Sequence, residues 1–338
     1  ARIVVPEPLK AVMSGERLTA DGEAVEGGRA FRFRMDKPVA PYLIAIAAGD
    51  LAFRKLGPRT GVWTEPAMLD KAAAELADTE KMVVAAEKLY GPYRWGRYDV
   101  VVLPPAFPYG GMENPTLTFL TPTFIAGDKS LNGLVAHELA HSWSGNLVTN
   151  ATWADSWLNE GFTSYFENRI MEAIYGKRRA AQEAALSFDE VTKALEEEGA
   201  TSAKTRLNLT AAEGTPDGGA SGIIYDKGAV FLRTIERIVG RERFDAWLRA
   251  YFDRYVALAV EQGMGFVLES PTWRANPDWA AKLGYDAKAL GDVQRRSVGR
   301  FSSDTYVSNA RLASAVGVHT QMPPCPWWVG NTPASDPG

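Results

Sequence analysis

The chain has 338 residues, of which 46% are hydrophobic, which is enough for two or three folded units with buried cores. Its formal net charge is −4 and it carries no basic block, so a nucleic-acid partner is not expected. The longest apolar stretch, YLIAIAAG at 42–49, is well short of the roughly 20 residues that span a bilayer, so no membrane partner is expected either.

A single cysteine, Cys325, cannot form an internal disulfide, and this fits a reducing compartment. We therefore expect a cytoplasmic location, with an exported form left open. No charged and then apolar leader follows Ala1, so we expect the natural N-terminus to lie further upstream.

Residues 1–60 are expected to form β-strands. The stretch RAFRFRM at 29–35 puts Phe31 and Phe33 on one face and the arginines between them on the other. This period of two is typical of a half-buried strand.

The segment 66–91 predicts one long helix, because it is rich in helix formers, opens after a proline and ends at a glycine. The apolar runs YDVVVLPP at 98–105 and TLTFLTP at 116–122 predict strands. The following sequence, to about residue 256, predicts mostly helices, with glycine stops at Gly176, Gly199 and Gly240. Strands followed by helices predict an α+β catalytic domain over residues 61–258.

Two of the three histidines, His137 and His141, lie four residues apart in VAHELAHSWSG at 135–145. On a helix, both imidazoles lie on one face and can bind one ion, and Glu138 stands beside them where it can act as a base. This HExxH pattern is a zinc motif of metalloproteases. An ordinary helix with two incidental histidines is the alternative.

A zinc site needs a third protein ligand, and the remaining histidine, His319, lies far along the chain. A carboxylate is therefore expected. Glu160 follows His141 after eighteen residues, on a helix that can pack against the first. Glu167 lies seven positions further on the same face, where it can accept the outer N–H of a ligating histidine. Solvated helix acids are the alternative for both glutamates.

This pattern resembles the gluzincin zinc aminopeptidases, the family of aminopeptidase N and leukotriene hydrolase, whose signature is HExxH, eighteen residues, and a glutamate within Asn-Glu-Gly. The likeness is greatest to the leukotriene-hydrolase branch and covers residues 1 to about 256. It implies an α+β chain in which the end of a β domain precedes a thermolysin-like, mostly helical zincin domain. It also implies one Zn²⁺ per chain on His137, His141 and Glu160, with Glu138 as the catalytic base.

A second stretch, FPYGGMENPTLTF at 107–119, resembles the family's Gly-x-Met-Glu-Asn element. The resemblance implies a substrate-binding edge strand in which Glu113 holds the α-amine of the substrate. Glycines let another backbone approach such a strand, and a carboxylate can pair with an ammonium group. A glycine-rich turn is the alternative. The expected substrate-binding residues here are Gly110, Gly111, Met112 and Glu113.

A third stretch, PDGGASGIIYDKGAVF at 216–231, places Tyr225 where the family has a tyrosine that binds the oxyanion of the tetrahedral intermediate. A phenol can stabilise such developing charge. Asp217 resembles an acid that shapes the substrate pocket in the leukotriene-hydrolase branch, so it is a further substrate-binding candidate. The alternatives are a buried tyrosine with a local partner and an ordinary turn.

These residues predict a zinc-dependent aminopeptidase that hydrolyses the N-terminal peptide bond, with a peptide bearing a free N-terminus as its partner. One alternative is a lipid epoxide hydrolase that uses the same zinc site. The other is an inactive zinc-binding fragment, because the family's upstream glutamine, which supports amine binding, would precede Ala1.

Residues 259–338 form a separate segment of uncertain structure. The stretch at 265–286 resembles a short piece of a homocysteine methyltransferase, without that family's cysteine ligands for zinc. From about residue 302 the sequence has no periodicity and many helix breakers. We expect that residues beyond about 258 do not belong to the same natural protein.

Overall fold

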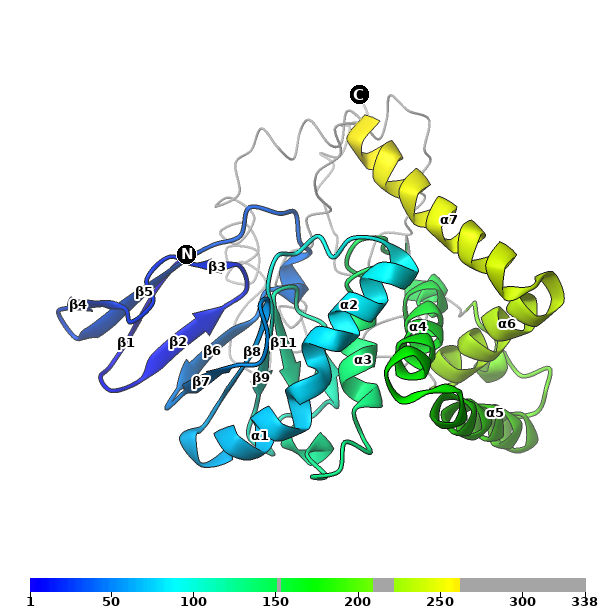
Figure 1. Cartoon of the computed structure of the whole chain (residues 1–338), viewed down its shortest axis with the longest axis horizontal. Helices are drawn as coiled ribbons and strands as arrows, with labels where there is room; N and C mark the ends of the chain where they lie inside the picture. Colours follow the sequence, from blue (N-terminus) through cyan, green and yellow to red (C-terminus); the bar gives the residue numbers. More distant parts are fainter. Residues whose placement is uncertain (151–152, 209–221, 262–338) are drawn as a thin grey trace, which may run out of the picture. The chain divides into compact units, whose positions relative to one another are not determined.

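The computed structural model describes residues 1–150, 153–208 and 222–261 (Figure 1). Of these, residues 1–39 and 43–261 belong to one compact unit. Short strands come first and long helices later, which confirms the predicted α+β class. Four features singled out in the sequence lie outside the described residues: Asp217, His319, Cys325 and the segment 265–286.

The first part of the chain consists of short antiparallel strands. Strand β5 (Gly28–Arg34) pairs with β1 (Arg2–Val5), β3 (Glu16–Arg17) and β4 (Glu23–Val25), and β2 (Lys10–Met13) pairs with β6 (Ile46–Gly49). Phe31 and Phe33 are buried, whereas Arg32 and Arg34 are exposed, so the predicted alternation is confirmed. The buried phenylalanines pack in a small apolar cluster with Val5 and Ala11.

A five-stranded sheet follows, in the order β10 (Gly111–Met112), β11 (Leu117–Leu120), β9 (Tyr98–Val102), β8 (Thr60–Thr64) and β7 (Ala52–Lys55). The two predicted strands correspond to β9 and β11, which pair in parallel. Strand β10 lies at one edge of this sheet. Because β7 and β8 belong to the same sheet, it extends across the predicted boundary at residue 60, and the division into domains stays a prediction.

Seven α-helices and six 3₁₀ turns are present among the described residues. The helices are α1 (Leu69–Glu75), α2 (Thr79–Tyr90), α3 (Gly133–Ala140), α4 (Trp157–Tyr175), α5 (Lys177–Glu198), α6 (Ile223–Val239) and α7 (Arg241–Glu261). The turns are η1 (Pro41–Leu43), η2 (Pro66–Met68), η3 (Leu76–Asp78), η4 (Pro122–Phe124), η5 (Trp153–Asp155) and η6 (Ala203–Thr205). No helix in this described part of the chain has the length and apolar character that crossing a membrane requires.

The predicted helix stops are confirmed, because α4, α5 and α6 each end at a glycine with positive φ. These φ values are 89° at Gly176, 87° at Gly199 and 87° at Gly240. Glycine adopts this left-handed conformation without the steric cost that a Cβ brings.

The single helix predicted for 66–91 is wrong, because the turn η3 separates α1 from α2. The break accompanies two tertiary contacts with the loop that leads into α3. The buried carboxylate of Glu75 accepts the backbone N–H groups of Gly127 and Lys129 at 2.8 Å each, and Asp78 binds the Lys129 ammonium group at 2.6 Å. Helix propensity depends only on the residues of the segment itself, so it does not predict such contacts.

Helices α3 and α4 pack against each other in the main core. Val135 and Leu139 of α3 are buried there together with Phe166 of α4. Leu131 lies before α3 and is 49% exposed, so it does not belong to this buried stripe. The buried stripe directs the opposite side of α3 toward the site described next.

Candidate metal centre

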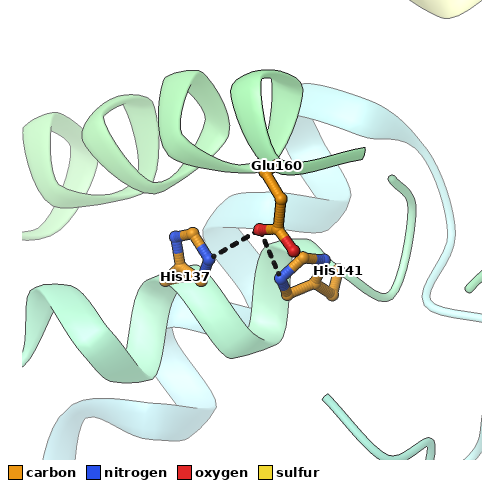
Figure 2. Close-up of side chains that lie close together, drawn as sticks. All are labelled: His137, His141 and Glu160. Carbon is orange, nitrogen blue, oxygen red and sulfur yellow. Dashed lines mark ion pairs between the residues drawn. The ribbon is translucent and has the colours of Figure 1, made fainter. Parts of the chain in front are cut away.

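His137 lies in the last turn of α3, and His141 caps the C-terminus of that helix. Their ring centroids are 4.9 Å apart, as the four-residue spacing on a helix requires. Glu160 lies in the first turn of α4 and points between the two rings (Figure 2). Its Oε2 atom is 3.4 Å from Nε2 of His137 and 3.4 Å from Nε2 of His141.

These distances fit a zinc ion. Ligand atoms at about 2.0–2.1 Å from a tetrahedral zinc are about 3.3–3.4 Å apart, and the Glu160 Oε2 atom is 3.4 Å from both histidine nitrogens. Glu160 Oε2 is also buried and makes no hydrogen bond in the described part of the chain. Buried polar atoms normally have a partner, so the three residues form a donor set that a divalent ion would complete.

The outer nitrogens of both histidines have acceptors. Nδ1 of His137 is 3.1 Å from Oε2 of Glu167. Nδ1 of His141 is 2.9 Å from Oδ1 of Asn159 and 3.1 Å from the carbonyl oxygen of Ser144. Each Nδ1 can therefore donate its hydrogen outward, which leaves the Nε2 lone pair directed at the shared point.

Sequence patterns do not single out Ser144, Asn159 and Thr163, yet these residues surround Nδ1 of His141. The Thr163 hydroxyl lies 3.1 Å from this nitrogen, and Asn159 immediately precedes Glu160. Of these three residues, only Asn159 could have been found from the sequence, because it is the asparagine of the Asn-Glu-Gly segment. The close approach of Asn159 also requires Gly145, which has a φ of 109° and where a Cβ would overlap the Asn159 amide.

The electrostatics of the site favour positive charge. Burial alone would lower the pKa of His137, but the neighbouring carboxylates of Glu160 and Glu167 outweigh it and raise this pKa well above its usual value. Burial would also lower the pKa of His141, but the charge of Glu160 raises it to about 9. Burial would raise the pKa of Glu160, and the two histidines nevertheless lower it. Such a site binds either protons or a metal cation that releases them.

Glu138 stands beside the metal centre and is only 5% exposed. Burial is the main cause that raises the pKa of Glu138 to about 8, and the two neighbouring histidines oppose it. Its Oε2 atom has no hydrogen-bond partner among the described residues. Its other oxygen lies against Gly111, where any Cβ would overlap it, so a glycine is needed at this position of β10.

The edge strand β10 comes close to this side of α3. Gly110, whose carbonyl accepts the Thr121 N–H at 2.9 Å, precedes β10, and Glu113 follows it. Glu113, Glu138 and His141 bring carboxylate and ring atoms within 4.8 Å of one another. The structure therefore brings Gly111 and Glu113, two of the predicted substrate-binding residues, next to the predicted base.

Tyr225 lies in the first turn of α6, and its ring stacks on that of His137 with centroids 5.9 Å apart. Helices α4 and α6 approach very closely at two glycines, since a Cβ on Gly228 would lie 2.6 Å from the Cα atom of Gly161. This contact brings Tyr225 to the metal centre. Burial is the main cause that raises the pKa of Tyr225 well above its usual value, so the phenol keeps its proton.

Residues 74–264 match the model of the Peptidase family M1 domain, which is more than half of the chain. The chain belongs to peptidase family M1. This membership confirms the family that the HExxH and Asn-Glu-Gly residues predict.

Individual family M1 relatives agree with this assignment. The chain is 44% identical over 265 residues to leukotriene A-4 hydrolase of Xenopus laevis, covering 77% of this chain and 43% of that protein. It is 41% identical over 274 residues to mouse aminopeptidase B, and the match covers 80% of this chain and 41% of that protein. The structure of yeast LTA4 hydrolase in complex with Bestatin matches with a TM-score of 0.68 and 39% identity. This match covers 75% of this chain and 40% of that protein. The chain thus spans less than half the length of these relatives.

Proposed function

We propose that this chain carries the catalytic centre of a zinc-dependent aminopeptidase, which removes the N-terminal residue of peptides. The observation that carries the proposal is the position of Glu160 Oε2, 3.4 Å from both histidine nitrogens. Membership of peptidase family M1 and the closeness of Glu113 and Glu138 to His141, within 4.8 Å of one another, support it.

His137, His141 and Glu160 would hold the zinc ion, one per chain. When bound there, zinc supplies a Lewis acid and lowers the pKa of a coordinated water molecule. Glu138 accepts the proton of the water that attacks the first peptide carbonyl, and then donates it to the leaving amine.

Substrate binding is assigned to the edge strand and its neighbours. The peptide would pair along β10, the edge strand that follows Gly110 and consists of Gly111 and Met112. Glu113 would form an ion pair with the free α-amine, which limits cleavage to the first residue. Tyr225 would donate its phenol hydrogen to the oxyanion that develops on the attacked carbonyl.

Metal analysis combined with a substrate pair tests this proposal. The purified 338-residue chain should contain one zinc per molecule and hydrolyse leucine p-nitroanilide but not its N-acetylated form. Glu160→Gln should lose zinc and activity together, whereas Glu183→Gln changes an acid on α5 and should lose neither. A chain that binds no zinc, or that cleaves both substrates equally, contradicts the proposal.

A second candidate function rests on the 44% identity to a leukotriene A-4 hydrolase. A lipid epoxide hydrolase would use the same donor set, and Asp217, outside the described residues, would help to shape its pocket. Assaying a fatty-acid epoxide beside the anilide separates the two activities. Zinc binding without hydrolysis of either substrate would indicate an inactive zinc-binding fragment.

Two further assignments stay proposals. We propose a boundary near residue 60 between the β domain and the catalytic domain, and a separate segment over residues 259–338. A cytoplasmic location is also proposed, on the basis of the single cysteine. Limited proteolysis tests the boundaries, and fractionation of the source cells tests the location.

A further inference from the structure

Glu113 lies one residue beyond the end of its strand. The ladder between β10 and β11 pairs Gly111 with Leu120 and Met112 with Phe119, and it ends there. The carbonyl oxygen of Glu113 instead accepts a hydrogen bond of 2.7 Å from the side-chain Nδ2 of Asn146. The backbone that carries the amine-binding carboxylate is therefore held from outside the sheet.

Asn146 belongs to a turn that is fixed to both helices of the metal centre. Its own N–H donates to the carbonyl of His141 at 3.0 Å. In the same turn, the Ser144 hydroxyl contacts the carbonyls of Leu158 and Asn159 at 3.1 Å each. The turn is thus attached by hydrogen bonds to the end of α3 and the start of α4. Asn146 extends from this turn to the substrate-binding strand.

We propose that Asn146 is a positioning residue that sets the place of the Glu113 carboxylate relative to the metal centre. The inference rests on the proposed function, because it takes Glu113 as the group that binds the α-amine. A misplacement of 1 Å in an active site can reduce the rate about 100-fold. This hydrogen bond directly connects the turn that holds Asn146 to the backbone of Glu113.

The chemistry of the contact distinguishes this role from that of an ordinary turn residue. A carbonyl oxygen only accepts hydrogen bonds, so the amide must direct its Nδ2 group at Glu113. The opposite Oδ1 atom is buried and has no hydrogen-bond partner in the described residues. Asparagine and aspartate serve almost equally well in turns. Only asparagine can donate here, and an aspartate would place a carboxylate oxygen against the carbonyl.

The test compares Asn146→Asp and Asn146→Ala with the original chain, each as the zinc-loaded 338-residue protein. The probes are leucine hydroxamate and its N-acetyl form, and calorimetry gives the ratio of their dissociation constants, which measures amine recognition without turnover. Asn168→Asp is the matched control, because the Asn168 Nδ2 group also donates to a backbone carbonyl, that of Ala180 at 2.8 Å.

Both Asn146 variants should lower the preference for the free amine about five- to tenfold, the value expected for a lost hydrogen bond. The affinity for the N-acetyl form and the zinc content should stay close to those of the original chain, and the Tm should fall by only a few degrees, because one hydrogen bond is lost. In a Glu113→Gln background, Asn146→Asp should have little further effect on the ratio, because the two residues act as a unit. Asn168→Asp should leave the ratio unchanged.

Three results for the variants would overturn the inference. Asn146→Asp could keep the full amine preference, both variants could weaken the two hydroxamates equally, or both could lose zinc or fold poorly, which would make the role structural. Absence of any amine preference in the original chain would remove the role of Glu113 and this inference with it. An original chain that shows the preference but hydrolyses no anilide contradicts only the proposed function.

Discussion

Replacing Gly228 by alanine should separate Tyr225 from the metal centre. Gly228 of α6 faces Gly161 of α4, and a Cβ at position 228 would lie 2.6 Å from the Cα atom of Gly161. Carbon atoms in ordinary contact are about 3.5–4.0 Å apart, so the two helices must separate by about 1 Å. Tyr225 lies three residues earlier on α6, and it would move with that helix.

The stability effect of Gly228→Ala should be small. Overpacking of this kind costs about 1–3 kcal/mol, and alanine regains about 1 kcal/mol of helix propensity relative to glycine. The net loss is about 0–2 kcal/mol, or a Tm decrease of a few degrees. The catalytic effect should be larger, because a shift of about 1 Å at a reacting group can reduce the rate about 100-fold.

The assay is the kcat for leucine p-nitroanilide, measured together with zinc content and Tm. Gly222→Ala is the matched control, because this glycine precedes the same helix and a Cβ there would meet no atom of the described residues within 4 Å. We expect kcat to fall about 10- to 100-fold in Gly228→Ala and to stay unchanged in Gly222→Ala. An unchanged kcat in a folded, zinc-containing Gly228→Ala variant would refute the reasoning.

Three further predictions concern the metal centre. Glu138→Gln should keep its zinc, since Glu138 is not a ligand, but kcat should fall about 10²- to 10⁴-fold; an active variant would show that another group moves the proton. Glu167→Gln should weaken zinc binding about 10- to 100-fold, because Nδ1 of His137 loses its carboxylate acceptor. Competition with a chelator measures the zinc affinity. An unchanged affinity would contradict the role of Glu167. Removing zinc with a chelator should lower the Tm, because the ion binds only the folded donor set. Zinc added in excess of its Kd should restore the Tm. A Tm that does not respond to zinc would contradict the site.

Much of the fold was predictable because its signals are local. The alternation at Phe31 and Phe33 and the glycine stops at Gly176, Gly199 and Gly240 depend on backbone geometry within a few residues. The break between α1 and α2 was not predictable in this way. It accompanies the contact of Glu75 with a loop more than fifty residues later in the chain.

The candidate site also has one part that local sequence predicts and one part that depends on tertiary packing. The spacing of His137 and His141 on one helix fixes their rings on one face, so the sequence indicates a pair of ligands. The sequence also supplies Glu160 as a candidate, on the basis of a motif. Its distance of 3.4 Å from both rings depends on how α3 and α4 pack.

The sequence by itself determined the types of side chain available and their order along each helix and strand. Only the tertiary structure decided which of them share a point in space. It placed Asn146 on the carbonyl of Glu113 and Tyr225 on the ring of His137. The reason is that backbone periodicity fixes positions only within an element, whereas contacts between distant elements depend on side-chain packing over the whole core.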